Sequence, residues 1–582
     1  MLNKYLYSYF TFFVLLLAAC GAGDGGLQER DLEKAKGDKY YGGIFRMNEV
    51  EYFRSLYPHN VTEVGGHRLT NQIYEGLVGL DQGDLTIVPV IAKSWEVDSQ
   101  ATEFIFHLRE DVYYHDDPCF PDGKGRNVTA HDFKYVFTRL CASGNDNQGY
   151  WVFEDKVQGC KDYYLSTLDG SPLPEGVTGV EVLDDYTLKI TLEKPFAAFL
   201  NLLALPFTAV FPEEAVEKYG RDMRTKTVGT GPFYVKAMKT DETVILSKNP
   251  NYWGKDEAGN QLPYLDGIRF SYIKERKSEL LELRQGNLDM IYRLPLEMVN
   301  EVVGPDEKLK PEYKNFELQS MANMSVQYYG FQHWSDLFEN KNLRIAFNYA
   351  VDRQKICSYT LKGTGIPGHY GIVPPAMTNY DAKALKGYEF NPDKARNFME
   401  KAGYPNGAGF PEITLQINSG GGTNEQVAEA VQSMLSEVLN IKINITKLPF
   451  AQHLENLETG KVDFWRAGWI ADYPDPENFL NLFYSKHIPE KLEDKSYLNS
   501  TRYKNPKFDA LFEEALQTVD DDQRNLLYLK AEQQMLDDAA IIPLFYYKDY
   551  RLLQPNVKNF PQNAMEHRNL REVYFVPVKN PS

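Results

Sequence analysis

Two side chains of opposite charge, Arg466 and Asp472, lie six residues apart in the segment 461–485, KVDFWRAGWIADYPDPENFLNLFYS. The planar guanidinium of Arg466 suits a carboxylate, and the carboxylate of Asp472 suits an ammonium group. Gly468 lies between them and has no side chain, so another backbone can approach it closely. This arrangement suits a short peptide zwitterion, bound by main-chain pairing and by its two charged ends.

The elements that must position these charges are a strand, a turn and a helix. Residues 462–469 are aromatic and extended in character, which predicts a strand. The run Asp-Tyr-Pro-Asp-Pro at 472–476 predicts a turn. Asp475 before Pro476 is typical of a helix N-cap followed by proline, and ENFLNLFYS then continues as an amphipathic helix.

Simpler interpretations exist for each of these residues. Arg466 could belong to a surface ion pair. Asp472 could be an Asx-turn residue before Tyr-Pro. Trp465 and Trp469 could be part of the hydrophobic core. The local pattern alone does not decide between these interpretations and a ligand site.

The segment WRAGWIADYPDPENFL resembles the ligand-binding segment of the oligopeptide-binding members of the family 5 extracellular solute-binding proteins. The resemblance implies that Asp472 pairs with the α-amino group of a peptide and that Arg466 can meet the carboxylate of a short one. It also implies that backbone groups of 468–471 pair with the ligand main chain. The candidate contacts along this segment, beside the two charges, are Gly468, Trp469, Ile470, Ala471 and Tyr473.

A second part of the chain resembles the opening of the same family. Tyr57-Pro58-His59 and the run IYEGL at 73–77 match a strand and loop that reach one wall of the cleft before a helix. By this resemblance, Glu63 and Val64 are candidate ligand contacts. An ordinary surface loop is the alternative interpretation.

The resemblance implies an α/β protein with the type II periplasmic-binding-protein fold, in which two α/β lobes are joined by crossing strands. Lobe 2 is expected at 322–540 and carries Arg466 and Asp472. Lobe 1 is expected in three pieces, with an inserted subdomain at 76–204. These three pieces are 41–75, 205–321 and 541–582.

The composition is that of a globular protein long enough for two or three domains, with 582 residues and a formal net charge of −18. The acidic balance argues against nucleic acid as a partner. We expect a monomer.

The N-terminus has the features of an export signal. Lys4 precedes an apolar run at 5–17, which is too short to span a membrane stably. The run ends in Leu-Ala-Ala-Cys-Gly, which resembles a bacterial lipobox and implies a signal peptide at 1–19 and lipidation of Cys20. Residues 20–40 are then a flexible tether. The expected location is the cell envelope, either the periplasmic face of a membrane or the outer face of a one-membrane cell, with membrane contact through the lipid anchor only.

Four further cysteines could form disulfides in an exported chain, and three complete pairings are open. Cys141 with Cys160 is the favoured pair because both flank one probable excursion of the chain. Cys119 and Cys357 are the other two. Nearby His and Asp residues at 115–132 are interpreted as turn and helix-start residues, so we expect no metal and no cofactor.

The resemblance implies a substrate-binding protein of an ABC importer, which captures short peptides and delivers them to permease and ATPase subunits on other chains. Relatives with this fold bind nickel chelates, haem or oligosaccharides, and these remain alternatives, as does a peptide sensor without transport. An enzyme is the alternative hypothesis from another functional class. Neither GxSxG nor HExxH occurs in the sequence, so we expect no enzymatic activity.

Overall fold

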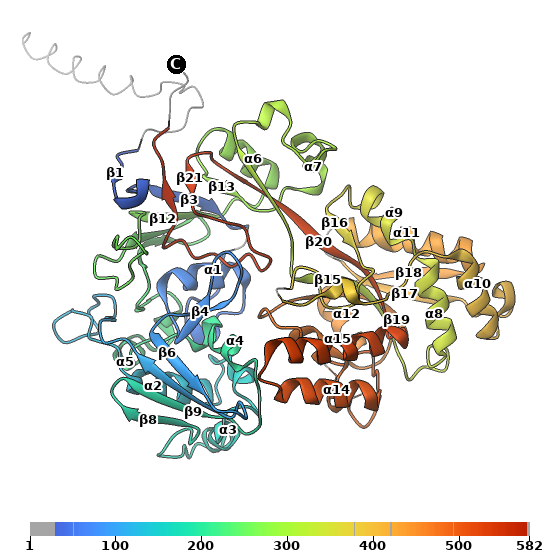
Figure 1. The fold of residues 1–582 in the computed structure, drawn as a ribbon, viewed down its shortest axis with the longest axis horizontal. Coiled ribbons are helices and arrows are strands. Elements are labelled where there is room, and N and C mark those ends of the chain that lie inside the picture. The colour runs from blue at the N-terminus through green and yellow to red at the C-terminus, as the bar shows by residue number, and fades with distance from the viewer. Residues whose placement is uncertain are drawn as a thin grey trace, which may run out of the picture.

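A computed structural model describes residues 30–50, 52–377, 379–419, 422–492, 494–496 and 498–578. Figure 1 shows these residues in two masses, with the N-terminal half of the chain on the left and residues from about 330 to 540 on the right. The long strand β20 (Ile541–Leu553) lies between them. None of the described helices is both long and apolar enough to cross a membrane.

A mixed sheet connects the two masses, with strand order β13-β20-β15-β19-β17-β18 and with β14 and β16 also paired to β20. The pattern over 411–448 predicts a strand, a helix and a second strand, and this unit is confirmed, because β17 and β18 pair in parallel around helix α11 (Gly422–Leu439). The strands besides β20 are β13 (Met290–Ile291), β14 (Glu317–Ala322), β15 (Ser325–Phe331), β16 (Gly365–Pro367), β17 (Ile413–Asn418), β18 (Ile443–Leu448) and β19 (Phe464–Ile470).

Two lines of chain cross between the masses. Strands β14 and β15 follow each other directly, and both pair antiparallel with β20. The apolar run at 539–547 predicts a return strand, and β20 is longer than that run because it continues to Leu553. Ile542 belongs to the apolar core around α8 (Lys341–Ala350), whereas Leu552 belongs to the core around α6 (Arg276–Arg284) and α7 (Leu296–Val302). The two ends of β20 are thus each packed into a different core, and the strand connects them.

The remaining strands form two four-stranded sheets and three short pairs. Phe104, Phe106 and Leu108 are buried on one face of β7, as their alternation predicts. The hairpin predicted at 181–192 is β8 with β9. The two larger sheets have the orders β10-β11-β12-β3 and β6-β7-β9-β8, with β3 (Ile44–Asn48), β6 (Ala92–Val97), β7 (Glu103–Leu108), β8 (Val180–Asp184), β9 (Thr187–Thr191), β10 (Phe233–Lys239), β11 (Thr243–Lys248) and β12 (Gly267–Ser271). The pairs are β1 (Glu33–Lys34) with β2 (Tyr40–Tyr41), β4 (Val78–Leu80) with β5 (Ile87–Pro89), and β21 (Val557–Lys558) with β22 (Tyr574–Phe575).

Two helices begin at residues that the local pattern favours as N-caps. Thr129 and Asp132 form a capping box at α2, and the Asn391 side chain accepts a hydrogen bond from the backbone N–H of Lys394 at α10. Among the described residues, no group of His, Cys, Asp and Glu could hold a metal ion. The α-helices are α1 (Val64–Ile73), α2 (Ala130–Leu140), α3 (Cys160–Leu168), α4 (Phe199–Leu203), α5 (Glu213–Tyr219), α6 (Arg276–Arg284), α7 (Leu296–Val302), α8 (Lys341–Ala350), α9 (Arg353–Lys355), α10 (Pro392–Lys401), α11 (Gly422–Leu439), α12 (Phe450–Glu458), α13 (Glu477–Leu480), α14 (Pro506–Gln517) and α15 (Asp521–Asp537).

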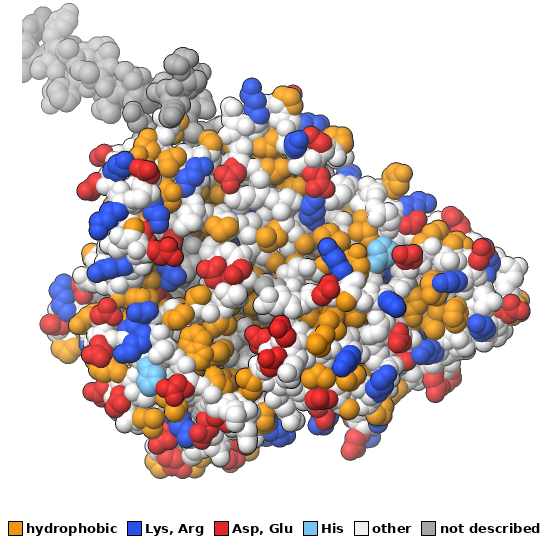
Figure 2. Space-filling view, viewed as in Figure 1, with side chains coloured by type: hydrophobic (Ala, Val, Ile, Leu, Met, Phe, Trp, Pro, Cys, Tyr) orange, Lys and Arg blue, Asp and Glu red, His pale blue; other side chains and the backbone are white. Residues whose placement is uncertain are grey.

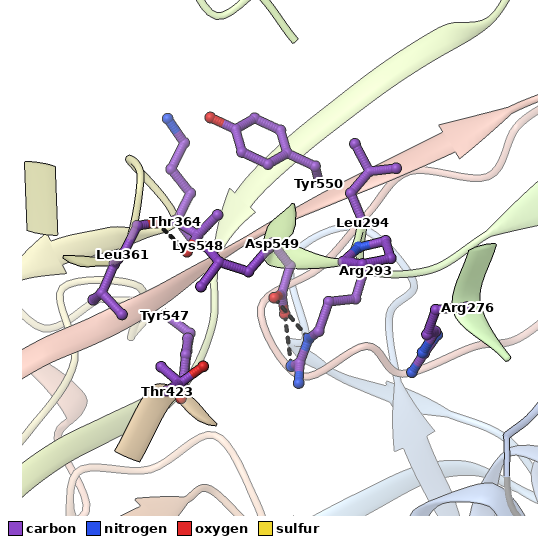
Figure 3. A pocket seen from close by; sticks show the side chains of 12 residues that line it. Arg276, Arg293, Leu294, Leu361, Thr364, Thr423, Tyr547, Lys548, Asp549 and Tyr550 are labelled. Atoms are coloured by element: carbon purple, nitrogen blue, oxygen red, sulfur yellow. Dashed lines mark hydrogen bonds and ion pairs between the residues drawn. The ribbon is translucent and has the colours of Figure 1, made fainter. Parts of the chain in front are cut away.

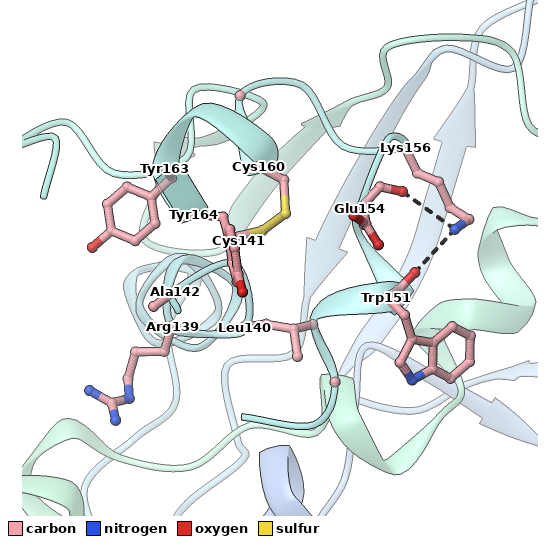
Figure 4. Close-up of a disulfide and its surroundings, with 12 residues drawn as sticks. Arg139, Leu140, Cys141, Ala142, Trp151, Glu154, Lys156, Cys160, Tyr163 and Tyr164 are labelled. Carbon is pink, nitrogen blue, oxygen red and sulfur yellow. Dashed lines mark hydrogen bonds between the residues drawn. A yellow bond between two sulfur atoms is a disulfide. The ribbon is translucent and has the colours of Figure 1, made fainter. Parts of the chain in front are cut away.

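One disulfide joins Cys141, at the end of α2, to Cys160, at the start of α3, with a Cα–Cα distance of 5.2 Å (Figure 4). The favoured pairing from the sequence is therefore confirmed. Cys119 and Cys357 are free thiols.

The C-terminal part of the expected tether is folded, which corrects that expectation. Strand β1 pairs with β2, and the side chain of Arg30 forms an ion pair of 2.5 Å with Asp289. Lys39 forms another of 2.8 Å with Asp256. These contacts attach the chain to the body of the protein from Arg30 onward. The expected signal peptide at 1–19 and the expected lipidation site Cys20 lie outside the described residues.

Candidate ligand-binding site

Strand β19 positions the central candidate residues, and it begins two residues later and ends one residue later than predicted. It pairs with β15 along its whole length, with Arg466 opposite Tyr329 and Gly468 opposite Gln327. On its other side, β17 pairs only with the first two residues of β19. Among the described strands, none therefore occupies the second edge of β19 beyond Trp465.

The direction of each backbone group on β19 follows from the register. The N–H of Ala471 donates to the carbonyl of Met324, continuing the ladder with β15. Because alternate residues of an antiparallel strand direct both polar backbone groups to the same partner, Gly468 and Ile470 direct theirs to the opposite, open edge. The expectation that all of 468–471 pair with a ligand is thus narrowed, since the Ala471 N–H is already used within the protein.

A cavity of about 490 Å³ adjoins this end of β19. Its walls come from α1 and the loop before it, the segments 204–207 and 292–293, the start of β15, the turn after β19, and the segment 564–567. Of the candidate residues, Val64, Ile470, Ala471 and Asp472 line it. Figure 2 shows acidic and basic side chains interspersed over one outer face of the molecule, so a single-sign surface does not mark the site there.

Asp472 is held at the cavity by a single amide. Its backbone N–H donates to Oδ1 of Asn478 at 3.2 Å, and Nδ2 of Asn478 donates to its Oδ2 at 3.3 Å. The side chain is open to the cavity, yet the surrounding protein mass raises the pKa of its carboxyl. None of the described residues places a cation within ion-pair distance of it. A carboxylate in this setting is ready to accept an ammonium group from a ligand.

Asn478 also fixes the neighbouring tryptophan. The indole Nε1 of Trp469 donates to Oδ1 of Asn478 at 2.9 Å, on the same oxygen that receives the Asp472 backbone. The sequence analysis missed Asn478, although it lies in the first turn of the predicted helix. Trp465 is fully buried, which agrees with the core interpretation for that residue.

Arg466 is covered by amide side chains. Its Nη1 donates to Oδ1 of Asn418 at 2.9 Å, and its Nη2 donates to Oε1 of Gln327. Burial lowers the pKa of its guanidinium, with the hydroxyls of nearby tyrosines acting in the opposite direction. Among the described residues, no carboxylate pairs with it. The charge therefore stays available to a ligand carboxylate that displaces one of the two amides.

Gly468 makes room for the same glutamine. A Cβ atom at this position would lie 2.4 Å from Nε2 of Gln327, whose side chain crosses the glycine on its way to Arg466. In this structure a side chain lies against Gly468, so the close approach of another backbone there stays a prediction.

Tyr473 is a correction to the predicted site. Its side chain is buried and its hydroxyl donates to the carboxylate of Glu477, which is also buried. Its ring packs into the hydrophobic core that the N-terminal half of the chain forms. Since the ring and hydroxyl are both occupied, Tyr473 holds the turn in place and does not face the cavity.

The turn and helix after Asp472 agree with the prediction only in part. Asp475 accepts a hydrogen bond of 2.9 Å from the backbone N–H of Glu477, as an N-cap residue does. Helix α13 is only four residues long and passes into a 3-10 turn at Asn481–Phe483. The predicted amphipathic helix over 477–485 is therefore shorter than expected.

The structure places Val64 at the cavity but not Glu63. Val64 is 58% exposed and lines the cavity at the start of α1. Glu63 precedes it and forms an ion pair with Arg54. Glu63 does not line the cavity.

A smaller cavity of about 210 Å³ adjoins the first one and shares Arg293 and Tyr547 with it. Figure 3 shows Arg293 directed at Asp549, and its Nε donates to Oδ1 of Asp549 at 2.8 Å. Lys548 and Arg276 also line this space. No sequence motif marked these residues, because they come from separate segments that only the fold brings together.

Comparisons with known proteins identify the family of this chain. Residues 86–489 match the family described as bacterial extracellular solute-binding proteins, family 5. The chain is 29% identical over 540 residues to the periplasmic oligopeptide-binding protein OppA of Salmonella typhimurium, which covers 91% of this chain and 92% of that protein. It is 28% identical over 502 residues to heme-binding protein A of Haemophilus influenzae, with 85% of each chain covered.

A solved structure extends the likeness to three dimensions. DppA, a periplasmic binding protein of Helicobacter pylori in complex with the peptide STSA, matches with a TM-score of 0.71 and 25% identity. The match covers 92% of this chain and 98% of that one. The fold is that of the type II periplasmic binding proteins. Because the family match spans more than half of the sequence, this chain belongs to the family 5 bacterial extracellular solute-binding proteins.

Proposed function

We propose that this protein captures short peptides as the substrate-binding component of an ABC importer. The observation that carries the proposal is the unpaired carboxylate of Asp472, located where the open edge of β19 reaches the cavity. The peptide amine pairs with Asp472, and its main chain pairs with Gly468 and Ile470. The similarity to an oligopeptide-binding protein and to a peptide-bound structure supports this assignment.

Capture ends with closure of the two lobes over the peptide. Lobe 1 comprises 41–75, 205–321 and 541–582, with the subdomain 76–204 inserted, and lobe 2 comprises 322–540. The two crossing lines, β14–β15 and β20, connect the lobes and serve as the hinge. Closure excludes water, which strengthens the charge-assisted hydrogen bonds to the peptide amine. The closed form is the one that a permease recognises, and an ATPase subunit on another chain supplies the energy.

The protein acts from the cell envelope as a monomer held by a lipid on Cys20. A cysteine after Leu-Ala-Ala supports this part of the proposal. Expression in cells fed a radiolabelled fatty acid tests it. The wild-type chain should carry the label and fractionate with membranes, and Cys20→Ser should be unlabelled and released. Label on the Cys20→Ser chain would contradict the assignment.

Native mass spectrometry tests the ligand class. Protein expressed without residues 1–20 is measured before and after partial denaturation. We expect a series of small adduct masses that fit short peptides and disappear on unfolding, which also reports peptide length. A single mass that fits haem, a nickel chelate or an oligosaccharide would replace peptide binding with another ligand class. Failure of added peptides of two to six residues to bind the emptied protein would also contradict the proposal.

A further inference from the structure

The disulfide closes a loop, residues 142–159, that builds part of the cavity wall. Both cysteines are fully buried, at the end of α2 and the start of α3. Within the loop, Val152 and Phe153 are buried in the core, and the ring of Tyr150 stacks on Tyr164 with centroids 4.1 Å apart. The loop is therefore held on both sides of its remaining aromatic residue, Trp151.

Trp151 points away from that core and lines the cavity. Its side chain is 38% exposed, and its ring meets the edge of Phe207, another lining residue, at a centroid distance of 6.0 Å. The Nζ of Lys156 donates to the carbonyl of Trp151 at 3.1 Å and fixes the backbone there (Figure 4). A large apolar ring that is partly exposed to a cavity is a contact surface for a ligand side chain.

Trp151 and Asp472 line the same cavity. Tyr473 belongs to the same apolar core as Val152 and Phe153. The charges of Lys156 and Asp472 both act on the buried Glu477, with Lys156 lowering the pKa of its carboxyl and Asp472 raising it. Trp151 is thus near the position where a peptide amine pairs with Asp472, at the amino-terminal end of the ligand.

Two further apolar side chains are exposed to the cavity. Ile470 and Val64 also line the cavity, with 69% and 58% of their side chains exposed. Of the two carboxylates that line the cavity, Glu566 pairs with Arg568, which leaves Asp472 as the unpaired one among the described lining residues. Exposed apolar side chains around one free charge suit a ligand end that has an amine and a large apolar group.

We infer that Trp151 is a specificity-determining residue that favours peptides whose first residue is aromatic or large and aliphatic. The Cys141–Cys160 disulfide positions it. The inference rests on the proposed peptide binding and adds the class of peptide. An aromatic side chain packed on Trp151 should tighten binding about tenfold relative to alanine at the same position, because burial of that area from water is favourable.

Calorimetric titration of the emptied protein tests this with peptides of the length recovered from it, identical except for phenylalanine or alanine in first position. The wild-type chain should prefer the phenylalanine peptide about tenfold. Trp151→Ala should reduce that preference to about twofold or less and barely change binding of the alanine peptide. Trp334→Ala is the matched control, since Trp334 is 40% exposed and does not line the cavity.

The outcomes separate the two proposals. If neither peptide binds the wild-type chain, the proposed function fails. If both bind equally well, or if Trp151→Ala weakens both by the same factor, peptide binding stands and the role of Trp151 is overturned.

A second variant tests the disulfide. Cys141→Ser with Cys160→Ser should keep binding of the alanine peptide and lose most of the preference, whereas Cys119→Ser should change neither. A folded double variant with unchanged preference would overturn the positioning role. Loss of its cooperative melt would also overturn that specific role, because the bond would then hold the whole subdomain together.

Discussion

The charged side chains at the two ends of β19 differ in how far other side chains cover them. At one end, Asp472 is open to the cavity and is held by Asn478 alone. At the other end, Arg466 donates to both Asn418 and Gln327 and is half-buried beneath them. Neither charge has an ion-pair partner among the described residues, yet only the anion faces the cavity directly.

The difference indicates an order of recognition. An ammonium group can pair with Asp472 without displacing any protein hydrogen bond. Two N–H groups of Arg466 already donate to amide oxygens, so a carboxylate that replaces one of these amides gains only the difference between two hydrogen bonds. We therefore expect the peptide amine to contribute most of the charge-dependent affinity and the carboxylate to contribute a smaller, length-dependent part.

Asp472→Asn should have the largest effect. The substitution keeps the size of the side chain but removes the charge that pairs with the amine. We expect peptides with a free amine to bind about 100-fold more weakly, about 3 kcal/mol, by calorimetry. N-acetylated peptides, which bind poorly to begin with, should be unaffected. An equal loss for both kinds of peptide would refute the assigned role of Asp472.

Binding should also weaken at low pH. Burial raises the pKa of Asp472 above its ordinary value of 3.8, and the peptide amine needs the ionised form. Affinity should be at its maximum at pH 7 and should fall as the pH drops through that raised pKa. Below the pKa, we expect a loss of up to about tenfold in affinity for each pH unit. Peptides with an amidated C-terminus remove the titration of the ligand's own carboxylate. The profile of Asp472→Asn should be flat over this range, and a profile like that of the wild type would assign the dependence to another group.

The raised pKa of Asp472 affects the stability of the fold in the opposite direction, because stability falls with rising pH whereas ligand affinity increases. A carboxyl whose pKa is raised by the fold loses its proton more easily in the unfolded chain, so the wild type becomes less stable as the pH rises through the window above 3.8. In the absence of ligand, Asp472→Asn should melt at pH 7 at the same temperature as the wild type or higher. A lower melting temperature would mean that the variant has lost structure as well as charge.

Asn478→Ala should have an intermediate effect. It removes the oxygen that accepts from both Trp469 and the Asp472 backbone, so the carboxylate remains but is no longer held. We expect about a tenfold loss of affinity for free-amine peptides in the same titration. Asn71→Ala is the matched control, because Asn71 lines the cavity without touching Asp472. A positioning role predicts little change for N-acetylated peptides, whereas general damage to the cavity would weaken them too.

Arg466→Gln should have the smallest effect. We expect about a fivefold loss, about 1 kcal/mol, and only for the one peptide length that places a carboxylate there. Gln327→Ala should do the reverse and tighten that length slightly, since it uncovers the guanidinium. A loss from Arg466→Gln that is the same at every length would show that Arg466 only supports the strand.

Local pattern predicted the elements that carry the candidate site. The strand, the turn and the capping of α13 by Asp475 depend on neighbouring residues, so they can be read from the chain. The disulfide between Cys141 and Cys160 was also predicted, because only a short excursion separates the two residues. These features are local, and local physics decides them.

Long-range contacts decided the rest. Asn418 and Gln327 cover Arg466 from 48 and 139 residues away, and no local pattern predicts which side chains will meet there. The register against β15 determined which backbone groups of β19 stay open, and core packing removed Tyr473 from the site. The sequence by itself determined which charges and which strand were available. The tertiary structure alone decided which of them face the cavity, because hydrogen bonds and burial between distant segments determine that.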